Sequence, residues 1–85
     1  MNRSETYRLK KQILDECTRV YNAINKNMTA KQYAATPWLP DMNQWCAHVE
    51  KHTKSKKQKA LIAEYRLLIE RLKPIQRRLS MRLVA

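Results

Sequence analysis

Residues 61–79 read LIAEYRLLIERLKPIQRRL, and they carry the most regular pattern in the chain. Apolar side chains recur there at steps of three or four residues, which is the spacing of one face of an α-helix. The positions on this face are Leu61, Tyr65, Leu68, Leu72, Ile75 and Leu79. The pattern predicts a long helix over 56–83, with a kink or a break at Pro74, because proline has no N–H to donate within a helix.

Three further apolar residues, Ile62, Leu67 and Ile69, widen this face. They fit either the core of the monomer or a contact with a second copy, so the pattern also allows a homodimer. Leu, Ile, Val and Phe together make up only about a fifth of the 85 residues, which is a low share for a globular chain. We therefore expect residues 1–85 to form a single helical domain with a thin core, which contributes at most about 3–5 kcal/mol.

The same helical spacing occurs near the N-terminus, where it predicts a helix over 3–27. Asn2 followed by Glu5, or Ser4 alone, can accept hydrogen bonds from the backbone N–H groups that open this helix. Its apolar face would consist of Leu9, Ile13, Cys17, Val20 and Ile24. The first part of the chain therefore supplies one long amphipathic helix.

A capping pattern and two prolines mark the middle of the chain. Thr29, with Gln32 three residues later, predicts a short helical turn near 30–35. The prolines that follow identify 36–40 as a linker within the domain, because proline disfavours helical geometry at the residue before it.

Asp41 predicts the start of another helix, over 42–53, and Ser55 with Gln58 predicts the start of the helix over 56–83. No proline or glycine separates the two helices, so they could also run together as one. No window shows the strict alternation of a strand. The predicted fold class is therefore all-α, a small bundle of three main helices with one short helical turn.

Several kinds of chemistry are not expected in this chain. It contains no glycine, which excludes P-loops, dinucleotide-binding fingerprints and nucleophile elbows. Cys17 and Cys46 fall at apolar positions and are expected to be buried thiols. His48 and His52 are four residues apart, but two ligands do not make a metal site, and surface histidines are expected instead. We predict no enzyme, no metal and no cofactor.

The chain shows no sequence signal for a membrane or for export. Its N-terminus is polar and its longest apolar run is short, so we expect no signal peptide, no membrane partner and a cytoplasmic protein.

The charge of the chain is strongly positive and unevenly distributed. The formal net charge is +11, and residues 51–85 contribute most of it. Within those residues only Glu64 and Glu70 oppose the lysines and arginines. An excess of this kind favours an anionic partner.

The first group of basic residues surrounds the predicted start of the helix over 56–83 and consists of Lys51, Lys54, Lys56, Lys57 and Lys59. The N-terminal end of a helix carries a partial positive charge, which disfavours lysine and favours a bound phosphate. The second group runs along that helix opposite its apolar face and consists of Lys59, Arg66, Lys73 and Arg77, with Arg71, Arg78 and Arg82 on an adjoining flank. Arg66 is expected to pair with Glu70, four residues later.

These groups predict a small basic binding module that contacts nucleic acid, mainly through phosphates, with the segment 51–82. The turn has no glycine and the helix start is rich in lysine, which favours contacts with the nucleic-acid backbone over helix-turn-helix reading of bases. The alternative is an adaptor or inhibitor that docks its basic helix on an acidic protein, such as a nucleic-acid-processing enzyme. The candidate contact residues are Lys54, Lys56, Lys57, Lys59, Arg66, Lys73, Arg77 and Arg78.

The aromatic residues divide into two sets. Four of them have helical spacing and apolar neighbours, and are expected in the core: Tyr7, Tyr21, Trp45 and Tyr65. Trp38 lies between Pro37 and Pro40. It is expected to clamp the linker onto the bundle, or alternatively to protrude as an anchor for a protein partner.

Overall fold

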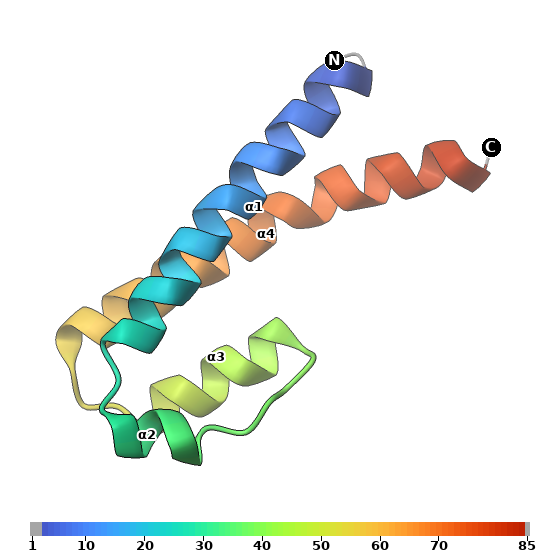
Figure 1. The fold of residues 1–85 in the computed structure, drawn as a ribbon. Coiled ribbons are helices and arrows are strands. Elements are labelled where there is room, and N and C mark those ends of the chain that lie inside the picture. The colour runs from blue at the N-terminus through green and yellow to red at the C-terminus, as the bar shows by residue number, and fades with distance from the viewer. Residues whose placement is uncertain (1–2, 85) are drawn as a thin grey trace.

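The computed structural model describes residues 3–84, and the side chains of 3–79. The described residues form four helices and no strand, which confirms the predicted all-α class (Figure 1). The helices are α1 (Arg3–Lys26), α2 (Ala30–Ala35), α3 (Met42–Lys51) and α4 (Lys56–Val84). The predicted cap at Asn2 lies outside the described residues.

The core is formed by the two long helices together with α3. Figure 1 shows α1 and α4 side by side over much of their length, with α2 and α3 at the end away from both termini. The predicted apolar faces meet there: α1 contributes Ile13, Cys17, Val20 and Ile24, α3 contributes Trp45, Cys46 and Val49, and α4 contributes Ile62, Tyr65, Leu68, Ile69 and Leu72. The three apolar residues beside this face of α4 differ in burial: Ile62 and Ile69 are buried, whereas Leu67 is 67% exposed.

A turn over 52–55 separates α3 from α4, so the two helices do not run together. Ser55 opens α4 as predicted, because its Oγ accepts a hydrogen bond from the backbone N–H of Gln58 at 3.2 Å. The Gln58 side chain is buried and reaches α1, where its Nε2 donates to the carbonyl oxygen of Ile24 at 2.9 Å. Its Oε1 accepts from Asn27 Nδ2 at 3.1 Å. The end of α1 and the start of α4 are therefore joined.

The short helices begin where the capping patterns predicted. Thr29 and Gln32 form a reciprocal capping box at the start of α2. The Asp41 carboxylate accepts from the backbone N–H groups of Asn43 and Gln44 at the start of α3. Helix α1 ends at Lys26, one residue before the predicted end at 27, and α3 ends at Lys51, two residues before the predicted end at 53.

Helix α4 continues through Pro74 without a break. Figure 1 shows it changing direction in its orange part, which agrees with the predicted kink and not with a separate terminal helix. Beyond the bend α4 diverges from α1, so the structure is elongated, with principal extents of 47 × 20 × 16 Å.

Burial raises the pKa of three groups in the core. Burial is the main reason that the pKa of the Cys17 and Cys46 thiols lies above its usual value. Both thiols are buried and free, as predicted. Burial also raises the pKa of Tyr65 to about 12, and the neighbouring Cys17, Cys46 and Tyr21 add to this shift. Burial therefore favours the neutral form of all three groups.

We expect the protein to lose stability at alkaline pH because of Tyr65. Between pH 10, its usual pKa, and about 12, the unfolded chain releases the phenolic proton while the folded protein keeps it. The free energy of unfolding should therefore fall in this range, by up to about 3 kcal/mol, since the pKa of Tyr65 is about 12 in the folded protein and 10 in the unfolded chain. Urea titrations of the wild type and Tyr65→Phe at pH 7 to 11.5 measure this difference.

The variant Tyr65→Phe should keep only the part of the alkaline loss that the thiols cause. Tyr33→Phe is the matched control, because Tyr33 is exposed and should leave the wild-type pH dependence unchanged. An identical alkaline loss in the wild type and Tyr65→Phe would contradict the raised pKa of Tyr65.

Candidate nucleic-acid interface

Five lysines surround the junction between α3 and α4, and we call them the basic turn: Lys51, Lys54, Lys56, Lys57 and Lys59. All five are exposed. Within residues 3–84 none of them forms an ion pair. The structure thus gathers these positive charges on one end of the bundle without neutralising them.

The local structure at the start of α4 adds to this positive charge. Its first turn contains no acidic residue, whereas three lysines lie in or beside it. The first backbone N–H groups of a helix have no partner within the helix and carry the positive end of its dipole. Ser55 satisfies one of them, at Gln58. The start of α4 therefore combines side-chain and backbone positive charge.

Three acidic side chains of α1 and α4 have cationic partners away from the basic turn. Arg19 bonds to Glu16 at 2.8 Å and to Glu64 at 2.9 Å, and the second of these pairs links α1 to α4. Because of Arg19, the pKa of Glu16 is lowered. Lys73 bonds to Glu70 at 2.9 Å. Glu64 and Glu70, which alone oppose the positive charge after residue 50, thus already have cationic partners.

The expected pair between Arg66 and Glu70 does not form. Arg66 Nη1 instead lies 2.7 Å from Glu50 Oε2, and this contact joins α4 to α3. Glu50 is distant in sequence, so helical spacing within α4 could not reveal it. Arg66 therefore takes part in holding the two helices together, in addition to carrying charge.

The predicted second group of basic residues is spread along α4. Lys59 and Arg77 are separated by about 27 Å, at a rise of about 1.5 Å per residue. Arg77 and Arg78 are exposed, and in the part of the chain that the structure describes they have no ion pair. Between the basic turn and these two arginines lie Arg66 and Lys73, which have carboxylate partners, and the exposed Arg71.

The aromatic residues only partly follow the sequence prediction. Trp45 and Tyr65 are buried and contact Tyr21, with ring centroids 4.8 Å and 6.2 Å from it, although Tyr21 is itself partly exposed. The prediction for Tyr7 was wrong, because Tyr7 is exposed and lies under the Arg3 guanidinium at 5.6 Å.

Trp38 does not clamp the linker onto the bundle, since 83% of it is exposed. It borders a hollow of about 500 Å³, whose other exposed aromatic and apolar residues are Leu14, Tyr21, Tyr33 and Met42. The alternative role of Trp38, as a protruding anchor for a protein partner, stays a prediction.

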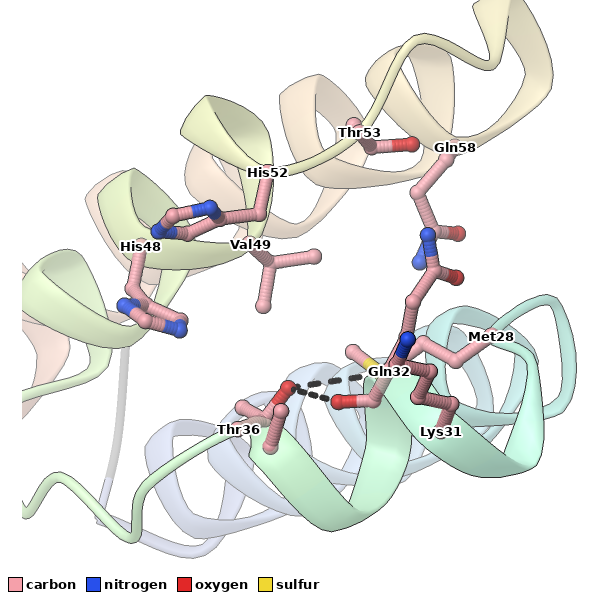
Figure 2. A pocket seen from close by; sticks show the side chains of 10 residues that line it. Met28, Lys31, Gln32, Thr36, His48, Val49, His52, Thr53 and Gln58 are labelled. Carbon is pink, nitrogen blue, oxygen red and sulfur yellow. Dashed lines mark hydrogen bonds between the residues drawn. The ribbon is translucent and has the colours of Figure 1, made fainter.

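A second cavity, of about 320 Å³, lies beside the basic turn, and we call it the histidine cavity. Figure 2 shows α3 on one side of it, with His48, Val49 and His52, and α2 on the other, with Gln32 and Thr36. Its remaining lining residues are Met28, Lys31, Ala35, Thr53 and Gln58. Sequence reasoning missed this cavity, because only the fold brings α2 against the end of α3.

The two histidines form a pair at one end of the cavity (Figure 2). Their ring centroids are 4.6 Å apart and their planes are tilted by 49°. Among the described residues, no group of three or more His, Cys, Asp or Glu side chains could hold a metal ion. The pair therefore presents two planar polar rings beside the basic turn.

Within the described part of the chain, no helix is both long enough and apolar enough to span a membrane. Comparisons with known proteins give no further guide, since no family model, no curated protein and no solved structure matches the chain.

Proposed function

We propose that this chain is a small nucleic-acid-binding module that contacts phosphates with the segment 51–82, and chiefly with the basic turn. One observation carries the proposal: the five lysines of the basic turn are exposed and gathered at the start of a helix whose first turn contains no acid. In the isolated protein this arrangement is unfavourable, because the lysines repel one another and the helix dipole. A phosphate backbone would make the same arrangement favourable.

The contacts would be of the kind that nucleic-acid backbones receive. Lysine offers a mobile point charge and suits phosphate oxygens, which position a protein on nucleic acid without reading its sequence. Arg77 and Arg78 would extend the contact along α4, because both are exposed. Lys73 and Arg66 would contribute less than the lysines, since each already has a carboxylate partner.

The adaptor hypothesis is the second candidate, and the exposure of Trp38 favours it. A tryptophan at the edge of a hollow is typical of the residues that dominate protein interfaces. The two hypotheses differ in their response to mutation. Loss of Trp38 should abolish binding to a protein partner and leave binding to nucleic acid unchanged.

Fluorescence anisotropy of labelled duplex DNA, single-stranded DNA and RNA tests the proposal, with titrations between about 50 and 200 mM salt. If about four or five phosphates are contacted, a plot of log affinity against log salt should have a slope near −4. The variant Lys56→Glu/Lys57→Glu/Lys59→Glu should bind far more weakly. Failure of all three polymers to bind at the lowest salt would reject the proposal and favour a search for an acidic protein partner.

A further inference from the structure

The histidine cavity opens directly beside the residues proposed to contact phosphates. His52 and Thr53 line it, and they belong to the segment between α3 and α4. Their sequence neighbours are Lys51 and Lys54 of the basic turn, and consecutive Cα atoms are only about 3.8 Å apart. Two lysines of the basic turn therefore flank, along the chain, two residues that line the cavity.

The cavity combines an apolar interior with a polar edge. Val49 points into it in Figure 2 and is buried, and Met28 and Ala35 add apolar surface from the opposite side. The imidazoles of His48 and His52 provide planar surfaces and ring nitrogens at one end. A planar heterocycle with hydrogen-bonding edges matches this combination.

The size and charge of the cavity narrow the class of ligand. A volume of about 320 Å³ is at the lower end of the range for small-molecule pockets, so it suits one small ring system. A positive charge, that of Lys31, lies at its edge, and no acidic residue lines it. An inorganic anion would leave the apolar surface of the cavity unused.

We infer that the histidine cavity receives one unpaired nucleobase of the nucleic acid whose phosphates contact the basic turn. This inference rests on the proposed function and specifies its substrate class. Bases of a continuous duplex are stacked and paired, whereas bases of single strands and loops can turn outward and stack on aromatic side chains, including histidine. The preferred ligand is therefore a single strand or a loop.

The test compares three labelled ligands of equal length at one low salt concentration: a single-stranded oligonucleotide, the same phosphodiester chain without bases, and a fully paired duplex. The single strand should bind about tenfold more tightly than the chain without bases, as the removal of one stacking contact would give. In His48→Ala/His52→Ala this preference should disappear, while affinity for the duplex stays the same. Trp38→Ala is the matched control, because it removes an exposed aromatic ring outside the cavity and should keep the preference.

NMR gives a readout that does not depend on a variant. The chain has two histidines, so their imidazole ¹H signals report directly on this cavity. Both signals should shift when the single strand is added and should shift much less with the chain that lacks bases. If the two chains bind equally and the imidazole signals do not move with either, the nucleobase site is wrong although the phosphate contacts stand. If no ligand binds at all, the proposed function fails as well.

Discussion

Replacement of Ile62 by alanine should unfold most of the domain at 25 °C. Ile62 is 1% exposed and belongs to the core that α1, α3 and α4 share. Truncation of a buried isoleucine to alanine costs about 2–5 kcal/mol, because apolar contacts are lost and a cavity remains. A single core in a chain of this length contributes at most about 3–5 kcal/mol. The loss is thus comparable with the whole stability of the protein.

Leu67→Ala is the matched control for this prediction. Leu67 lies on the same helix and is 67% exposed, so its truncation should change the free energy of unfolding by no more than about 0.5 kcal/mol. Urea titrations followed by far-UV circular dichroism, at two protein concentrations, measure both variants. A strong loss in Leu67→Ala that decreases at the higher protein concentration would instead place Leu67 in a contact between two copies.

These two residues also show how far helical periodicity can predict a core. The steps of three and four residues correctly identified the buried side of α4. They could not predict which of the flanking residues Ile62, Leu67 and Ile69 are buried, because the width of a buried face depends on where the neighbouring helices lie. The arrangement of α1 and α3 around α4 buries Ile62 and Ile69 and leaves Leu67 outside.

Local signals predicted the helix starts better than the contacts of the same residues. Thr29, Asp41 and Ser55 cap their helices as the sequence indicated, because a capping bond joins residues two or three positions apart. The side chain of Gln58, in contrast, bonds to Ile24 on another helix. Tertiary packing brings these residues together, and no short pattern contains both of them.

In the candidate site, too, local features could be predicted from the sequence and tertiary contacts could not. The lysines of the basic turn are adjacent in sequence, so composition alone could locate them. The pairing of Arg66 with Glu50 depends on the turn over 52–55, because this turn separates α3 from α4 and allows them to lie against each other. The sequence allowed this turn but could not require it, since a continuous helix remained possible.

Charge reversal in the basic turn should have opposite effects on binding and on stability. In Lys56→Glu/Lys57→Glu, two phosphate contacts are lost and two repulsive charges are added, so affinity for nucleic acid should fall about 100-fold near 100 mM salt. The salt slope should become less negative by about 2. The free energy of unfolding should rise by about 1 kcal/mol, because carboxylates are favourable in the first turn of a helix and lysines are not. This corresponds to an increase in Tm of about 4–8 °C.

Lys10→Glu/Lys11→Glu is the matched control, because it changes the net charge by the same amount. It separates the effect of the basic turn from the effect of net charge alone. Lys10 and Lys11 lie within α1, away from its ends, where the helix dipole gives little stabilisation. This control should gain no stability and should lose much less affinity, since the start of α4 lies beside the C-terminal end of α1, where Gln58 bonds to Ile24, and Lys10 and Lys11 lie near the other end. Equal losses of affinity in both variants would mean that net charge alone drives binding, without a defined site. Lysines at the start of α4 lower the stability of the isolated protein, and a contact with phosphate gives a reason for their presence there. A larger loss of affinity in Lys56→Glu/Lys57→Glu than in Lys10→Glu/Lys11→Glu would support this reason.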